Sequence, residues 1–143
     1  MLTSLLDTSL CIRALRDRPV EVRDRIKTEF DNICISSIVR YELYVGIALT
    51  GGCERKQKEI EDFLSAIPCL AFDDKAAFHA ADIRADLTRK GNIIGPNDLL
   101  IAGHARSLGL KLITGNLKEF SRVDGMRCED WVASLPESPH GTS

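Results

Sequence analysis

Short apolar runs alternate with longer amphipathic stretches along the chain, and this alternation constrains the fold more than any other feature of the sequence. The runs have the length of buried parallel strands and cover residues 2–6, 32–35, 69–72 and 110–114. The stretches between them carry apolar residues at helical spacing, as in Ile60, Phe63, Leu64 and Ile67. Alternating strands and helices favour a parallel sheet with helices on both faces, so we expect an α/β fold.

Polar capping residues, prolines and glycines predict where the helices begin and end. The predicted helices cover residues 10–15, 19–30, 38–49, 60–67, 74–91, 96–108 and 117–120. Thr8 or Ser9 can cap the first of them, and residues 126–128 are predicted to form an edge strand. We expect one domain over residues 1–132, followed by a Pro-rich, polar and disordered tail over residues 133–143.

The composition excludes several classes of protein. The chain is 44% hydrophobic and 28% charged, and no apolar run approaches the roughly 20 residues that cross a bilayer, which excludes a membrane protein. The first residues lack a basic residue before the apolar stretch, which favours a cytoplasmic protein over a secreted one. Five cysteines without a CxxC pair indicate free thiols rather than zinc or disulfides. The net charge of −2 does not by itself suggest a nucleic-acid partner.

Two acidic residues stand where such folds bind ligands, beyond the carboxyl ends of the strands. Asp7 directly follows the first predicted strand. Asp98 follows an irregular GPN turn near the amino end of a helix, where the helix dipole favours a carboxylate. Each of them could instead be a simple helix cap, and for a single Asp that is the more common role.

Glu42 is harder to explain as a structural residue. Helical spacing places it on the same face as Ile38, Val45 and Leu49, and a carboxylate in an apolar stripe is costly unless it is paired or binds a metal. The alternative to a functional role is an ion pair with an arginine such as Arg40.

Oxygen ligands without a histidine cluster suit a hard cation such as Mg²⁺ or Mn²⁺. Such a site could activate water for attack on a phosphodiester and neutralise charge on the phosphate. His104 is expected to be packed or locally hydrogen-bonded, His79 to lie on the surface and His140 in the tail. The sequence contains no GxGxxG, GxxxxGK[ST], GxSxG or HExxH pattern, so the commonest nucleotide-binding, serine-hydrolase and zinc-protease classes are excluded.

Four motifs, in this order and closed by EDW, resemble the PIN-domain toxins of the VapC type: LLDTSLCI, SSIVRYELYVG, GPNDLLIAGHA and LITGNLKEF. The resemblance covers the chain from Met1 to about Trp131. It implies a PIN-like three-layer α/β/α sandwich with a central, mostly parallel sheet. It also implies a magnesium- or manganese-dependent endoribonuclease that is the toxin of a toxin–antitoxin pair. Family members often cut tRNA, and similar enteric ones cut initiator tRNA. Their partners are a cognate antitoxin and a second copy of the toxin, so a homodimer and a toxin–antitoxin hetero-oligomer are expected.

Carried over by position, the resemblance implies three acids of the site, Asp7, Glu42 and Asp98, with Asp7 and Asp98 binding the metal. Many PIN domains have an Asp where this chain has Asn116, and Glu119, three residues on, can supply the missing charge as a fourth catalytic acid. Asn116 is an accessory that can still accept through its amide oxygen but adds no negative charge, so one metal ion is expected rather than two. Two hydroxyls are possible accessories: Ser9 orders the Asp7 loop or caps a helix, and Thr114 contacts the site or only closes a strand.

Basic residues gather on two predicted helical regions and could form a rim around the acidic site. They are Arg13, Arg16, Arg18, Arg23, Arg25 and Lys27 on the first region and Arg84, Arg89 and Lys90 on the other. A solvated face balanced by acids explains them equally well.

Two other functions compete with the ribonuclease. Asn116 at the fourth position allows a catalytically inactive PIN-fold module that mainly engages an antitoxin. An acid-site phosphatase or phospho-acceptor domain is disfavoured, because Ser9 stands where a phosphatase needs a second Asp.

Overall fold

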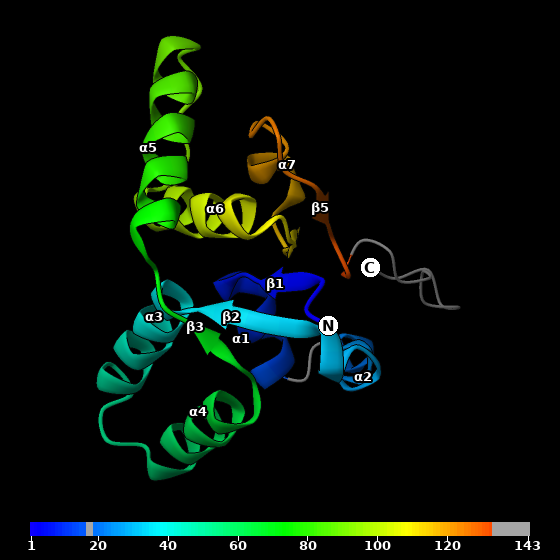
Figure 1. Ribbon diagram of the computed structural model, residues 1–143. Helices are drawn as coiled ribbons and strands as arrows, with labels where there is room; N and C mark the ends of the chain where they lie inside the picture. Colours follow the sequence, from blue (N-terminus) through cyan, green and yellow to red (C-terminus); the bar gives the residue numbers. More distant parts are fainter. Residues whose placement is uncertain (17–18, 133–143) are drawn as a thin grey trace, which may run out of the picture.

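A five-stranded parallel sheet forms the centre of the molecule. The computed structural model describes residues 1–16 and 19–132. The strands are β1 (Ser4–Leu6), β2 (Ile33–Ser36), β3 (Cys69–Leu70), β4 (Lys111–Ile113) and β5 (Cys128–Glu129). They are arranged in the order β3-β2-β1-β4-β5, and all four neighbouring pairs are parallel (Figure 1). Leu5 of β1 lies opposite Cys34 of β2 and Leu112 of β4, so the first strand occupies the middle of the sheet.

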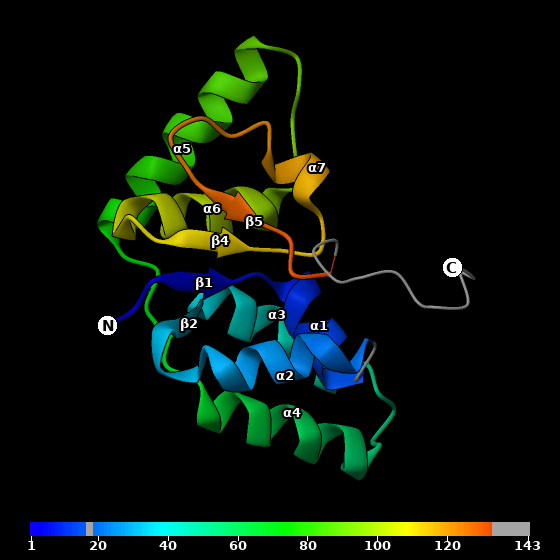
Figure 2. The ribbon, with the colours of Figure 1, turned by 90° about the vertical axis from the view of Figure 1, so that its right-hand side faces the viewer.

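Helices cover both faces of this sheet. The first half of the chain supplies α1 (Thr8–Arg16), α2 (Val20–Thr28), the 3-10 turn η1 (Phe30–Asn32), α3 (Ser37–Ala48) and α4 (Glu54–Ala66). The second half supplies α5 (Asp74–Arg89), α6 (Pro96–Leu108) and the short α7 (Leu117–Phe120). In Figures 1 and 2, α5 and α6 lie on one side of β1, whereas α1, α2 and α4 lie on the other. The expected three-layer α/β/α architecture is therefore confirmed.

The core sits between the strands and the apolar faces of these helices. The central strands are completely buried at Leu5, Leu6, Ile33, Ile35, Leu112 and Ile113. Helix α6 is buried over most of its surface, as predicted, and α5 buries Ala76, Ala80, Ile83 and Leu87 on one face. All five cysteines are free thiols, as expected. Among the described residues, no helix is both long and apolar enough to cross a membrane.

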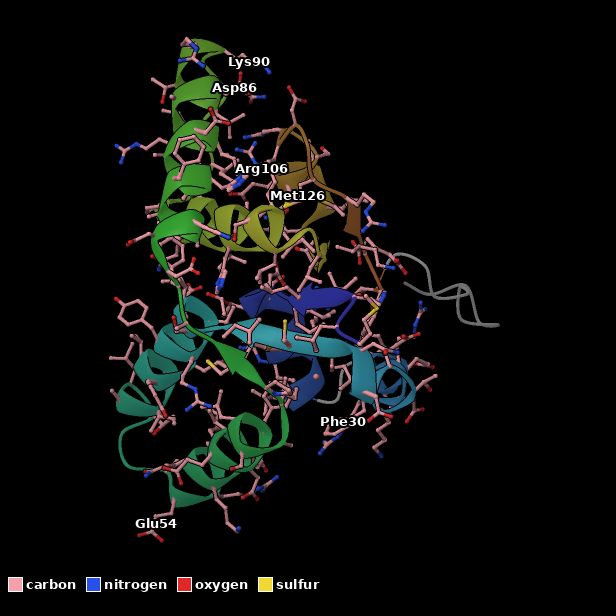
Figure 3. All side chains as sticks on the ribbon, in the orientation of Figure 1. Phe30, Glu54, Asp86, Lys90, Arg106 and Met126 are labelled. Atoms are coloured by element: carbon pink, nitrogen blue, oxygen red, sulfur yellow. The ribbon has the colours of Figure 1, made fainter. Side chains whose placement is uncertain are left out.

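Helices α5 and α6 approach each other closely at two small residues. A Cβ atom placed on Gly103 would lie 2.5 Å from the backbone nitrogen of Ala80, so only glycine fits at this crossing. Arg106, one turn further along α6, reaches across to α5 (Figure 3). Its guanidinium donates hydrogen bonds to Nδ1 of His79 at 2.9 Å and to the carboxylate of Asp82 at 2.6 Å. These contacts fix α6, which carries Asp98, against α5.

Several predicted boundaries were wrong. The second helix ends at Thr28, and Phe30, expected within it, begins the 3-10 turn and is 42% exposed. The edge strand lies at Cys128–Glu129 rather than at residues 126–128. The first helix is not capped by Thr8 or Ser9, because the Asp7 carboxylate accepts the hydrogen bond from the Leu10 N–H at 2.9 Å. The predicted tail over residues 133–143 lies outside the described residues, as do Arg18 and His140.

Candidate active site

Asp7 stands between the end of β1 and the first turn of α1, and its side chain is only 2% exposed. Burial raises the pKa of Asp7, and repulsion from Glu42 adds to the rise. Hydrogen bonds from Thr114, from the Leu10 backbone and from Ser9 oppose it. Asp7 thus has the capping role considered from the sequence, but it also carries a second set of contacts that a cap does not need.

Those contacts come from two hydroxyls, Ser9 and Thr114. Ser9 Oγ donates to both carboxylate oxygens of Asp7, at 2.8 and 2.9 Å, and Thr114 Oγ1 donates to Oδ2. Each hydroxyl in turn accepts a backbone N–H from the loop after β4: Gly115 donates to Ser9 at 3.1 Å and Asn116 donates to Thr114 at 2.8 Å. A hydroxyl that accepts from an N–H keeps its own proton free to donate. The loop after β4 therefore orients both hydroxyls toward Asp7.

Glu42 faces the same region from α3. Its Oε1 accepts a hydrogen bond from the Thr8 hydroxyl at 2.5 Å, and its Oε2 lies 3.4 Å from the amide nitrogen of Asn97. The alternative ion pair with Arg40 does not form, because Arg40 donates to the Tyr44 hydroxyl and to the Leu64 carbonyl.

The apolar stripe used to single out Glu42 was assigned to the wrong face. Helix α3 buries Val39 and Leu43, whereas Val45 is 40% and Leu49 80% exposed. Glu42 therefore does not sit in a buried stripe. It lies at the edge of the buried face, where it reaches toward Thr8 and Asn97.

Asp98 and Glu119 form a close pair of carboxyl groups. Asp98 stands in the first turn of α6 and Glu119 in α7. Burial raises the pKa of Asp98 to about 7, helped by hydrogen bonding to Glu119 and by repulsion from Glu119, Asp7 and Glu42. Ionisation of Asp98 beside Glu119 is therefore costly, because two adjacent carboxylates repel each other.

Glu119 is held in place by two donors. The Gly95 N–H donates to its Oε1 at 2.9 Å, and the Asn116 amide donates to its Oε2 at 2.6 Å. Asn116 therefore uses its amide nitrogen to position Glu119. The structure places the carboxylate of Glu119, rather than a side chain at position 116, beside Asp98.

The structure thus brings together all four acids that the sequence singled out: Asp7, Glu42, Asp98 and Glu119. They come from the junction of β1 and α1, from α3, from α6 and from α7, and each lies within electrostatic reach of at least one other. Within the described part of the chain, none of them forms an ion pair with a lysine or arginine. Four uncompensated acids in a partly buried site repel one another, and a cation among them would relieve that repulsion.

The donor set fits a hard divalent cation. It consists of carboxylate oxygens flanked by hydroxyls, which suits Mg²⁺ or Mn²⁺ better than zinc. No three acidic, histidine or cysteine side chains of residues 1–16 and 19–132 already close around a single point.

The two histidines of the described part of the chain, His104 and His79, lie apart from this cluster. His104 is buried, with its Nδ1 2.8 Å from Ser36 Oγ and its ring edge-to-face with Phe72, so its expected packing role is confirmed. Burial lowers the pKa of His104. His79 is half-buried and accepts its hydrogen bond from Arg106.

The predicted basic rim is partly engaged in structural contacts. Arg25 pairs with Glu129 and lies 4.9 Å from the ring centroid of Trp131, so the closing EDW motif anchors α2 to the sheet. Lys90 pairs with Asp86 near the end of α5 (Figure 3). An open groove of about 830 Å³ lies between α1, α2 and α4. Arg16, Arg23 and Lys27 of the predicted rim line it, together with Arg55 and Lys56 of α4.

Sequence reasoning missed the roles of three residues near the site. Thr8 was considered only as a helix cap, although its hydroxyl donates to Glu42. Gly95 and Asn97 belong to the GPN turn, which was recognised as irregular but not as a source of hydrogen-bond donors to Glu119 and Glu42. The turn itself was the signal, since an irregular segment before a helix exposes backbone N–H groups.

Comparisons with known proteins extend these observations. The family model for the PIN domain matches residues 4–126. The tRNA(fMet)-specific endonuclease VapC of Salmonella typhimurium is 44% identical over 131 residues, which are 92% of this chain and 99% of that protein. Ribonuclease VapC2 of Haemophilus influenzae is 43% identical over 92% of this chain and 100% of its own length.

Solved structures give the same result. The chain superimposes on DNA-bound VapBC from Salmonella typhimurium with a TM-score of 0.87 at 44% identity, over 92% of this chain and 99% of that one. It matches VapBC2 from Rickettsia felis, bound to a promoter DNA fragment, with a TM-score of 0.85 at 36% identity, over 91% and 99% of the two chains.

Proposed function

This chain belongs to the PIN-domain family and groups there with the VapC ribonucleases, and we propose that it is the toxin of a toxin–antitoxin pair that hydrolyses RNA phosphodiester bonds. One observation carries the proposal: Asp7, Glu42, Asp98 and Glu119, from four separate elements, meet at one site without a protein cation among the described residues. Such a site is built to act on a phosphodiester with the help of a divalent cation.

In this proposal Asp7 and Asp98 hold Mg²⁺ or Mn²⁺. When bound, the cation would lower the pKa of a water molecule and offset the charge that develops on the phosphate. Ser9 and Thr114 fix the orientation of Asp7 through their hydrogen bonds. Glu42 assists as a further ligand or as a base that orients water, and its carboxylate is aimed by Thr8.

Glu119 acts together with Asp98 as the fourth acid. Asp98, whose pKa is raised to about 7, must lose its proton before it can bind a cation as a carboxylate. The Gly95 N–H and the Asn116 amide then stabilise the Glu119 carboxylate through charge-assisted hydrogen bonds. This arrangement weakens the main reason for an inactive binding module, which was the absence of an Asp at position 116.

The substrate is proposed to be tRNA, and initiator tRNA in particular. The support is the similarity over nearly the whole chain to the endonuclease of Salmonella typhimurium that is named as specific for tRNA(fMet). The protein partner is an antitoxin, as in the VapBC complexes that the chain resembles.

A second copy of the chain is proposed as a further partner. Residues Tyr41, Tyr44, Val45 and Leu49 follow the i, i+3, i+4, i+8 spacing along α3, and all are between 40% and 80% exposed. An exposed apolar helix face of this kind marks a protein-interaction surface. Homodimerisation through α3 would cover it.

Incubation of the purified protein with a tRNA mixture and Mg²⁺ tests the activity directly. We expect discrete cleavage products, which sequencing of the new RNA ends would locate, and loss of cleavage when EDTA removes the metal. Asp7→Asn should lower the rate by about 100-fold or more, because a lost ligand costs at least as much as a lost outer-shell partner. Asp74→Asn, which changes an exposed acid in α5, is the matched control.

Calorimetry separates the ribonuclease from the inactive module. We expect Mg²⁺ to bind with an affinity that depends on Asp98. Two results together would favour the inactive module. One is that tRNA stays intact, and the other is that the protein shows no magnesium binding that depends on Asp98.

A further inference from the structure

A small pocket opens beside the acidic cluster. Its volume is about 290 Å³, and residues of α1, α3 and α4 line it. Its apolar lining includes Ile12, Leu43 and Ile60, and Arg16 and Lys56 bring positive charge to it. Glu42 belongs to both the pocket and the acidic cluster, so whatever enters the pocket lies next to the reacting site.

Gly46, in the middle of α3, forms part of the pocket wall. A glycine inside a helix costs about 1 kcal/mol relative to alanine, so it calls for a reason. Its backbone does not need glycine, since it is not among the positive-φ residues. Packing does not need it either, because a Cβ atom placed there would meet nothing within 4 Å. The missing side chain leaves the wall of the pocket open, as glycines do where a ligand approaches the backbone.

We propose that this pocket receives one unpaired base of the RNA substrate, next to the phosphodiester that the acidic cluster cleaves. The inference rests on the proposed ribonuclease function and adds a specificity subsite to it. Proteins read RNA sequence mainly through unstacked bases of loops and single strands. Glu42 lines the pocket and belongs to the acidic cluster, so a base held in the pocket would lie beside the site.

The chemistry of the walls suits a base. Apolar side chains from three helices can contact the flat faces of a ring. The Thr50 hydroxyl donates to the Ile47 carbonyl and Glu59 pairs with Arg55 through one oxygen, so both keep acceptor atoms for donors on the edge of the base. Arg16 and Lys56 also line the larger groove between α1, α2 and α4, so the two hollows are adjacent. Both cations can therefore contact phosphates on the strand that leaves the pocket.

Removal of single bases from the RNA tests the proposal. Once the cleavage site in tRNA is mapped, RNAs that lack one base at each position around the scissile bond are compared by kcat/KM. For the wild type, removal of one particular base should lower kcat/KM by roughly 10- to 150-fold, as expected from the ~1.5–3 kcal/mol that burial of an apolar group contributes. Gly46→Leu, which fills the pocket, should lower kcat/KM on intact RNA and abolish the difference between intact and base-deleted RNA.

Two further variants calibrate the result. Gly46→Ala adds only one methyl group and should give a smaller loss than Gly46→Leu. Ala77→Leu introduces the same side chain as the filling variant, on the exposed face of α5, and should keep the wild-type response to base removal. Leucine and alanine are better helix formers than glycine, so thermal melts should show that the Gly46 variants remain folded.

The outcomes distinguish a failure of the base pocket from a failure of the ribonuclease function. A wild type that cleaves tRNA but responds to no base removal, or a Gly46→Leu variant that responds as the wild type does, would overturn the base pocket alone. A wild type that cleaves no RNA would overturn the ribonuclease function and the pocket with it. If Gly46→Leu cleaves normally but escapes neutralisation by a co-expressed antitoxin, the pocket belongs to the protein partner and the proposal is wrong.

Discussion

The carboxylate of Asp7 accepts hydrogen bonds from Ser9 and Thr114, and each of these hydroxyls accepts a backbone N–H from the loop after β4. Thr114→Val keeps the shape of the side chain but removes the hydroxyl that donates to the buried Asp7 carboxylate, which should cost about 1–3 kcal/mol of stability. We expect RNA cleavage to fall about 10- to 100-fold, as for other outer-shell partners of metal ligands. Thr114→Ser, which retains the hydroxyl, should recover most of the activity. Equal activity of the Val and Ser variants would contradict the positioning role.

The raised pKa of Asp98 has a consequence for stability in the absence of metal. Its folded pKa of about 7 lies above the ordinary 3.8, so the folded protein binds more protons than the unfolded chain between about pH 4 and pH 7. Stability contributed by this group is therefore present below pH 4 and is lost as the pH rises through 7. Asp98→Asn removes the cost of ionising the buried acid. In EDTA it should raise the melting temperature at pH 8 and change it little at pH 4.

The size of this gain is limited by solvent. Asp98 is only about half buried, and screening reduces the effect to about 1 kcal/mol, or a few degrees in melting temperature. Asp62→Asn on the exposed face of α4 should show no such dependence on pH. If Asp98→Asn raises the melting temperature equally at pH 4 and pH 8, repulsion among the acids is not the source of the gain.

Among the elements, α5 and α6 form the tightest crossing, and Gly103 sets its distance. Gly103→Ala would place a Cβ atom 2.5 Å from the Ala80 backbone, so the helices must separate. We expect a loss of about 1–3 kcal/mol in the free energy of unfolding, measured by urea denaturation. The same substitution at Gly46, where space is open, should stabilise the protein by about 0.5–1 kcal/mol. Stabilisation at both positions would show that the crossing tolerates the extra methyl group.

The order of elements could be predicted from the sequence because each is marked locally. Ser36 and Asp73 do cap α3 and α5, and Gly109, with a positive φ of 67°, ends α6. The buried face of α3 could not be predicted, because this helix carries apolar residues on more than one side. Spacing alone does not tell which side meets the sheet and which remains exposed.

The site could be predicted to the level of its acids but not of its hydrogen bonds. Asp7 and Asp98 were indicated by their places at a strand end and a helix start, which local sequence marks. The direction of the Asn116 amide and the donation from Thr8 to Glu42 depend on elements far apart in sequence. No local pattern encodes them, since they arise only when the sheet has assembled.

For the whole molecule, the exposed face of α3 determines the expected state of association. Leu49, at 80% exposure, stands on this face with Tyr41 and Val45. Leu49→Lys should shift the protein from dimer to monomer, because a buried unpaired charge is costly at an apolar interface. Light scattering after size-exclusion chromatography measures the mass directly. Phe78→Lys, at an exposed position on α5, should leave the dimer intact, and a wild-type protein of monomer mass would refute the interface.

The acids of the site are contributed in succession along the chain, with Asp7 at the start of α1 and Glu119 in α7 near the end of the described residues. A chain still being synthesised therefore lacks part of its cleaving apparatus until almost the whole domain has been made. Loss of any of these segments removes an acid from the proposed site, so the site can form only in a chain that extends to α7.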